Sequence, residues 1–169
     1  MEVPYSRDDI ETLLKHQTKI LRYEELQNYP NIVNLLYPYG SVVILYPVRS
    51  ETDGHWTALF YSKTDNGKIC IEFFDPYGTS IDREFKYIDK YGNTPRYLSR
   101  LLTTSPYPVE YNDYDFQQKA MGVNTCGRWV VLRVQNADLT LSQFAHLFRP
   151  SDDITTDQLA VLVTSIQQL

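Results

Sequence analysis

Apolar positions follow two different periods along the chain, and the change of period separates expected helices from expected strands. Near the N-terminus apolar residues recur at helical spacing after Ser6, whose hydroxyl suits the cap of a helix running from about 7 to 20. A second helical or irregular stretch covers residues 23–36. Pro30 would end any helix in that stretch at or before Tyr29.

The middle of the chain changes to short β-rich runs. Three of them, at residues 41–46, 56–61 and 69–74, are separated by loops rich in Asp, Gly, Ser and Thr. Asp65-Asn66-Gly67 is a hairpin signal between the last two runs, so these strands are expected to be antiparallel neighbours. Residues 109–111 suit a fourth strand.

The remaining periodic segments favour helices. They are residues 96–102, 126–134, 142–148 and 156–166, the last begun by Asp152 or Thr155. The adjacent valines at 130 and 131 would also suit a strand. A small central sheet with helices at both ends of the chain, without repeats or linkers, predicts one α+β domain over residues 1–169.

Composition narrows the class of protein. A chain of 169 residues that is 43% hydrophobic can build one sizeable core without metal or disulfide support. A net charge of −5 and a pI of about 5.1 give no support for a nucleic-acid partner. Because no early apolar run follows Met1 and no stretch of about 18 apolar residues occurs, neither a signal peptide nor a membrane span is expected.

The two cysteines, Cys70 and Cys126, have 55 residues between them. This spacing is neither a disulfide framework nor a zinc pattern, so we expect a reducing compartment and no metal or other cofactor. A lone cysteine combined with a histidine elsewhere in the chain is a candidate nucleophile.

Cys126 lies where a polar loop enters an apolar helical run. At the start of a helix the macrodipole and free backbone N–H groups favour a thiolate, and the same groups can receive an oxyanion. Gly127 would let a substrate carbonyl approach closely. The alternative is that Cys126 is a small core residue, as most free cysteines are. Position alone leaves the two interpretations about even.

His55 opens one expected strand, and Asp75 ends the next. Antiparallel pairing through the hairpin would bring the two side chains together. A carboxylate bonded to one ring nitrogen fixes the histidine tautomer and supports an imidazolium beside a thiolate. Taken singly, His55 could be a surface histidine beside Trp56, and Asp75 an Asp-Pro turn initiator.

The remaining candidates compete poorly. His16 and His146 lie within expected helices and are interpreted as surface or packing residues. Cys70 alternates with Ile69 and Ile71 in an expected strand, which predicts a buried and unreactive thiol.

The order of these motifs resembles a known family of proteases. His55-Trp56, then Phe74-Asp75-Pro76-Tyr77-Gly78, then glutamine and Cys126-Gly127 resemble the adenovirus maturation protease (adenain) and its relatives over residues 54–131. Those relatives include virophage, giant-virus and transposon capsid proteases and the cellular SUMO and ubiquitin-like-protein proteases. The resemblance implies a papain-like cysteine protease core in circularly permuted order, with His, Asp and Cys as the triad.

The resemblance also implies further site residues. A glutamine upstream of the cysteine helps to form the oxyanion hole in this family, and Gln117 and Gln118 are both available, nine and eight positions before Cys126. Which of them points inward stays open. Trp56 would pack beside the histidine and shape a substrate groove. Adenovirus enzymes carry Glu where this chain has Asp75. Activation by DNA or by a disulfide-linked peptide is not expected, because the chain is acidic and its other cysteine, Cys70, is expected to be buried.

The expected activity is hydrolysis of peptide bonds in a viral capsid or other virion precursor, at glycine-containing sites, by a monomer in the host cytoplasm and the virion. A narrow groove between Trp56 and the cysteine loop would explain a preference for glycine. The motifs at 74–78 and 125–129 look more like the capsid proteases. Two alternatives remain: a protease that deconjugates a SUMO- or ubiquitin-like modifier, and a catalytically silent interaction domain on the same fold.

Overall fold

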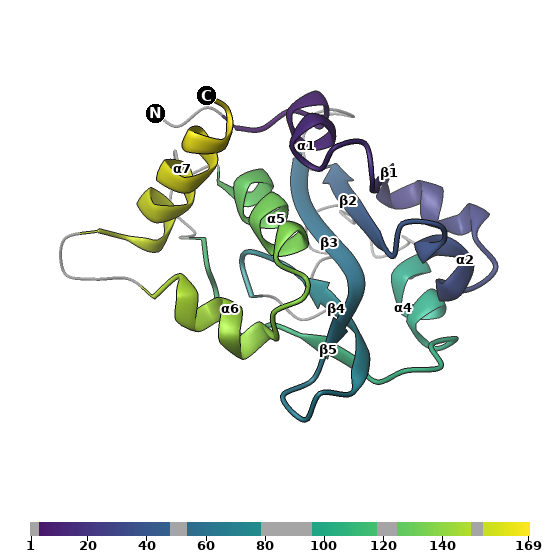
Figure 1. The fold of residues 1–169 in the computed structure, drawn as a ribbon. Helices are drawn as coiled ribbons and strands as arrows, with labels where there is room; N and C mark the ends of the chain where they lie inside the picture. Colours follow the sequence, from purple (N-terminus) through teal and green to yellow (C-terminus); the bar gives the residue numbers. More distant parts are fainter. Residues whose placement is uncertain (1–3, 48–53, 79–95, 118–124, 150–153) are drawn as a thin grey trace.

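A computed structural model describes residues 4–47, 54–78, 96–117, 125–149 and 154–169. Its centre is a five-stranded sheet in the order β1-β2-β3-β4-β5 (Figure 1). The central strands β2, β3 and β4 are antiparallel, while β1 runs parallel to β2 and β5 parallel to β4. The strands are β1 Lys19–Arg22, β2 Ser41–Pro47, β3 Gly54–Lys63, β4 Ile69–Phe74 and β5 Val109–Tyr111.

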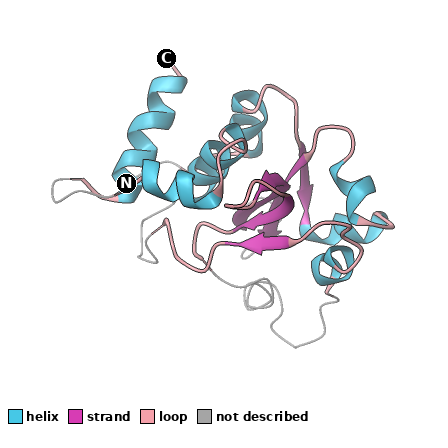
Figure 2. Cartoon of the chain, turned by 60° about the horizontal axis from the view of Figure 1, so that its bottom comes forward, coloured by secondary structure: helices cyan, strands magenta, loops and turns pink. Residues whose placement is uncertain are grey.

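Helices cover both faces of the sheet (Figures 1 and 2), which confirms the predicted α+β class. One face packs against α1 Arg7–Leu13, α5 Cys126–Gln135, α6 Leu141–Leu147 and α7 Thr156–Gln167. The other face packs against η1 Tyr23–Asn28, α2 Ile32–Leu36 and α4 Tyr97–Leu102. None of the helices in the described ranges is long and apolar enough to cross a membrane.

The first predicted helix is only half right. Ser6 caps α1 through a capping box with Asp9, as expected, but the helix ends at Leu13 instead of continuing to about 20. Lys15 and His16 then adopt left-handed φ angles of 57° and 55°, which turn the chain back toward the sheet. The following residues form β1, because pairing with β2 satisfies their backbone groups and outweighs helical periodicity.

The other predicted elements are confirmed within a residue or two. η1 ends at Asn28, before Pro30, and Asn31 caps α2. β3 and β4 form the antiparallel pair around a turn in which Gly67 has a φ of 78°. Thr155 caps α7, whereas Asp152 lies outside the described residues.

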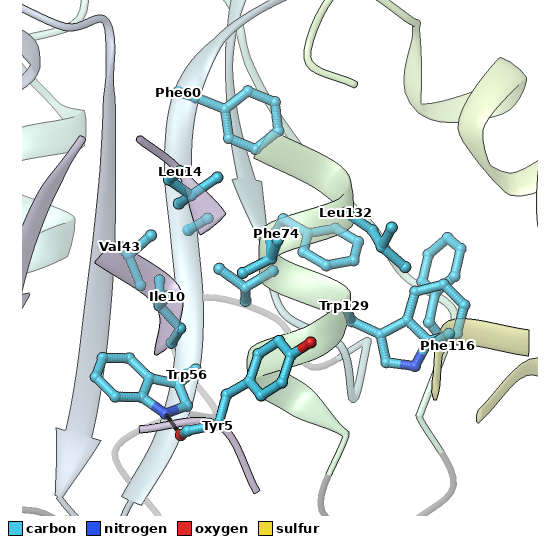
Figure 3. Packing of buried hydrophobic residues seen from close by; sticks show 14 of the residues in the cluster. Tyr5, Ile10, Leu14, Val43, Trp56, Phe60, Phe74, Phe116, Trp129 and Leu132 are labelled. Carbon is cyan, nitrogen blue, oxygen red and sulfur yellow. Dashed lines mark hydrogen bonds between the residues drawn. The ribbon is translucent and has the colours of Figure 1, made fainter. Parts of the chain in front are cut away.

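Contacts with neighbouring elements fix α5 near both of its ends. Aromatic rings pack against its first turns: the ring of Trp129 lies beside that of Phe116 (Figure 3), with 5.2 Å between ring centroids, and 5.4 Å from that of Phe148. Further along, the fully buried Arg133 pairs with the fully buried Glu72 of β4, with 2.7 Å between Nη2 and Oε1. The helix start that carries Cys126 therefore has a fixed place beside the sheet.

Candidate active site

His55 and Asp75 meet at one end of the β3–β4 hairpin. His55 is the second residue of β3, and Asp75 directly follows β4, whose last residue, Phe74, pairs with Ala58. The Nε2 of His55 lies 2.5 Å from the Oδ1 of Asp75, and both side chains are buried. The neighbourhood that the hairpin signal predicts is thus confirmed.

Backbone and side-chain contacts fix the orientation of Asp75. The backbone N–H of Tyr77 donates to the same Oδ1 at 2.9 Å. Asn112 accepts from the backbone N–H of Asp75 at 3.0 Å and donates to its carbonyl at 2.5 Å. The amide of Asn112 also donates to the carbonyl of Tyr114 at 3.0 Å. The sequence interpretation missed Asn112, whose only local signal is its place directly after the expected strand at 109–111.

Cys126 joins this pair as the first residue of α5. Its side chain is half-buried and interacts with the side chain of His55, whose pKa it helps to raise. The structure therefore brings together the three residues that the sequence singles out.

The proton affinity of His55 reflects these neighbours. Burial lowers the pKa of His55, but the charge and hydrogen bond of Asp75, together with Cys126, outweigh burial and raise the pKa from 6.5 to about 9. The imidazolium form therefore dominates at neutral pH. A protonated ring in this position can give its proton to a leaving group.

Tyr77 and Gln117 extend the site. The ring of Tyr77 stacks on the imidazole of His55, with 4.4 Å between centroids and 22° between planes. Gln117 is buried, its side-chain N–H group donates to the Tyr77 hydroxyl at 3.5 Å, and its backbone N–H donates to the carbonyl of Pro76 at 2.9 Å. Gln118 lies outside the described residues. Of the two candidate glutamines, Gln117 is therefore the one with a described contact to Tyr77, the residue that stacks on His55.

Gly127 and Trp56 differ from the expectation. A Cβ atom on Gly127 would lie 2.9 Å from the Cβ of Tyr5 and 3.3 Å from the Cδ1 of Trp56, so glycine is required here for packing in the core. Trp56 is itself buried, and its indole N–H donates to the carbonyl of Tyr5 at 3.3 Å (Figure 3). The expected groove between Trp56 and the cysteine loop involves residues 118–124, which lie outside the described residues, so that groove stays a prediction. The open side of Trp56 lines a pocket of about 350 Å³ together with Leu45.

The residues set aside in the sequence lie apart from this site. Cys70 is fully buried, and burial together with the nearby Glu110 and Glu72 raises the pKa of its thiol to about 12. His16 lies 3.7 Å from Glu11 on the surface, and His146 is exposed on α6. Among the described residues, no group of three or more His, Cys, Asp or Glu side chains could hold a metal ion.

Comparison with known proteins places the chain in a viral family. It is 34% identical to the "uncharacterized protein V9" of Sputnik virophage over an alignment of 174 positions, which covers 96% of this chain and 95% of V9. The chain belongs to the V9 family. Membership of the V9 family relates the chain to a virophage protein over nearly its whole length. No family profile matches the chain.

Two solved structures show distant likeness to this V9-family chain. A de-sumoylating protease aligns with 96% of the chain and 71% of its own, at 16% identity and a TM-score of 0.36. The Rickettsia bellii effector protein RickCE aligns with 60% of the chain, at 21% identity and a TM-score of 0.34. The aligned part spans only 37% of the effector. Likeness at this level is too distant to carry an argument about this chain.

Proposed function

We propose that this chain is a cysteine endopeptidase with Cys126 as nucleophile, His55 as general base and acid, and Asp75 as the residue that orients His55. The observation that carries the proposal is the unbroken contact series from Asp75 through His55 to Cys126. A nucleophile bonded to a base that a third group orients is the general arrangement of covalent catalysis. The core would be papain-like, in circularly permuted order.

The first half of the reaction forms an acyl-enzyme. The Cys126 thiolate attacks the scissile carbonyl carbon, and the carbonyl π electrons move to oxygen. The tetrahedral intermediate then collapses, the C–N bond breaks, and the leaving amine takes the proton from the His55 imidazolium. A thioester on Cys126 and a neutral His55 remain.

The oxyanion needs hydrogen-bond donors that are already in place. Backbone N–H groups at the start of α5 are free of intrahelical partners and can supply one or two donors. The side-chain amide of Gln117 supplies another, since it is buried beside the ring that stacks on His55. We therefore assign the oxyanion role to Gln117 in preference to Gln118.

The second half regenerates the enzyme. Neutral His55 takes a proton from water, the oxygen of that water attacks the thioester, and the C–S bond breaks. The products are a carboxylic acid and the Cys126–His55 pair in its starting protonation state. Asp75 holds the ring in one orientation through both halves.

The relationship to a virophage protein supports a viral protein as the substrate. We propose a virion structural protein precursor, such as a capsid protein, that is cleaved in the infected cell or assembling particle at glycine-containing sites. The proposed enzyme acts as a monomer and without a cofactor.

A direct test uses purified wild type, Cys126→Ala and Cys70→Ala with a capsid precursor from the same virus. Wild type and Cys70→Ala should release fragments whose ends mass spectrometry identifies, and Cys126→Ala should release none while keeping its thermal unfolding profile. Cys70→Ala is the matched control, because it removes the other thiol. Cleavage by Cys126→Ala at the wild-type rate would overturn the assignment.

Two further arms separate the alternatives. A fluorogenic conjugate of a SUMO- or ubiquitin-like modifier, hydrolysed faster than the capsid precursor, would identify a deconjugating enzyme. Small haloacetamides should alkylate Cys126 at neutral pH much faster than an ordinary thiol with a pKa of about 8.5. Alkylation at the ordinary rate, with no hydrolysis of either substrate, would identify a silent interaction domain.

A further inference from the structure

The first turn of α7 contacts both segments that supply the proposed oxyanion donors. Its first residue, Thr156, donates its hydroxyl to the backbone carbonyl of Phe116 at 2.7 Å. Phe116 immediately precedes Gln117, and the backbone N–H groups of both donate to the carbonyl of Pro76. The Gln117 segment is therefore held between the Asp75 turn and α7.

The second residue of α7 contacts the nucleophile segment. Asp157 is buried, and its Oδ1 accepts hydrogen bonds from the hydroxyl of Thr125 and, at 3.2 Å, from the indole N–H of Trp129. Thr125 is fully buried and directly precedes Cys126. One carboxylate oxygen thus ties the start of α5 to the start of α7.

Further contacts along α7 keep this turn in place. Thr155 caps the helix through a capping box with Gln158. One turn or more later, the guanidinium of Arg128 on α5 donates to the hydroxyl of Thr164 at 2.7 Å. Ala160 lies fully buried in the same core as α5. α7 therefore meets α5 at two levels, and its first turn cannot shift independently.

Sequence connectivity alone would not set the distance between Gln117 and Cys126, because eight residues separate them along the chain. Donors in an oxyanion hole must lie roughly 2.7–3.1 Å from the developing negative charge, and a misplacement of about 1 Å can lower the rate about a hundredfold. The Gln117 segment and the start of α5 therefore need a structural element that contacts both and fixes the distance between them.

We propose that Thr156 and Asp157 are positioning residues, which hold the Gln117 amide and the Cys126 helix start at a fixed separation for oxyanion binding. This inference rests on the proposed peptidase function. The C-terminal helix would act on the reaction through two backbone segments, without touching the substrate.

Thr125→Val and Thr156→Val test this role, because valine keeps the shape of threonine and removes only the hydroxyl. Each variant should lower kcat for a cleaved peptide roughly tenfold to a hundredfold and leave KM unchanged. Alkylation of Cys126 by a small haloacetamide should proceed at the wild-type rate, since His55 and Asp75 are untouched. Thr125→Ser and Thr156→Ser restore the hydroxyl and should restore kcat.

Thr103→Val is the matched control. Its hydroxyl also donates to a backbone carbonyl, that of Arg100, at 2.6 Å, but it lies on the exposed end of α4 on the opposite face of the sheet. This variant should keep the wild-type kcat.

Three outcomes would overturn the inference. Unchanged kcat in both valine variants would show that the contacts only stabilise the fold, and an equal fall in alkylation would place their effect on the thiol. If Thr125→Val does not fold, the half-exposed Thr156→Val still decides the question. Absence of Cys126-dependent hydrolysis in the wild type would overturn the proposed function and this inference together, whereas normal wild-type hydrolysis with unaffected variants overturns the inference alone.

Discussion

The side chain of Asn112 forms two hydrogen bonds with the backbone of Asp75. Its side-chain oxygen accepts from the Asp75 N–H at 3.0 Å, and its side-chain nitrogen donates to the Asp75 carbonyl at 2.5 Å. The backbone of the residue whose carboxylate meets His55 is therefore fixed by the Asn112 side chain. Asp75 and Asn112 are 37 residues apart, so this support depends on β4 and β5 being neighbours.

Replacing Asn112 with alanine should reduce both stability and catalysis. The change leaves buried backbone groups of Asp75 without these bonds, which costs about 1–3 kcal/mol of unfolding free energy. Urea unfolding measures this loss, and kcat should fall because Asp75 no longer holds His55 in one orientation. Asn31→Ala is the control: it removes the cap of α2 on the opposite face, costs about 1 kcal/mol and should leave kcat unchanged. Equal kcat values for the two variants would contradict the role of Asn112.

Replacing Tyr77 should separate the effect of its ring from that of its hydroxyl. Tyr77→Leu removes the face stacked on His55, and loss of a cation–π contact worth roughly 1–2 kcal/mol should lower the pKa of His55 by about one unit. Tyr77→Phe keeps the stack and should keep the pKa of His55, but it removes the acceptor of the Gln117 amide and should lower kcat. NMR titration of the His55 ring protons measures the first effect. An unchanged pKa in Tyr77→Leu would show that the stack is electrostatically neutral.

The stability of the protein should depend on pH through His55. Its pKa rises from 6.5 to about 9 on folding, so the folded state binds the proton more tightly than the unfolded state. The resulting stabilisation, at most about 3 kcal/mol, is complete below pH 6.5 and is lost as the pH rises through about 9. Urea unfolding of wild type and His55→Gln at several pH values measures it as the difference between the two proteins. That difference should shrink from pH 6.5 to 9, and a difference that grows over this range would contradict the prediction.

Asp75→Asn provides the internal control for that experiment. The substitution removes the charge that raises the pKa of His55, so burial, which lowers the pKa, should then dominate. The pH-dependent contribution of His55 to the free energy of unfolding should disappear or change sign in this variant.

The buried ion pair of Arg133 and Glu72 lies outside the proposed active site and should contribute to the stability of the fold. Arg133→Met leaves a carboxylate buried without its cation, which costs about 3–5 kcal/mol. The double variant Arg133→Met/Glu72→Leu should recover most of that loss, because no buried charge remains. Arg22→Met, which removes the cation of the part-exposed Arg22–Glu24 pair, should cost less than about 1 kcal/mol. Thermal and urea unfolding measure all three, and similar losses in the two single variants would contradict this prediction.

Local signals were sufficient where the decisive contacts are short in sequence. Ser6 and Thr155 bond to backbone groups three residues away, which is why their capping patterns can be recognised from residue types alone. The hairpin at Gly67 likewise joins strands that are adjacent in sequence. Its antiparallel geometry then leads directly to the meeting of His55 and Asp75.

Long-range pairing decided what local patterns could not. The first helix is predicted to continue to about residue 20, but Lys19–Arg22 forms β1, since its backbone partners are in β2. Gly127 suggests an open approach to the nucleophile, yet its neighbours are Tyr5 and Trp56, which fill the space beside it.

By itself, therefore, the sequence determined the order of the elements other than β1, and it identified the residues suited to covalent catalysis, which are His55, Asp75 and Cys126 at the ends of regular segments. Only the tertiary structure decided how those residues are held. Asn112 and Asp157 act through contacts with residues 28 to 37 positions away along the chain. Such contacts leave no local pattern in the sequence, because they arise only when the sheet and the helices pack together.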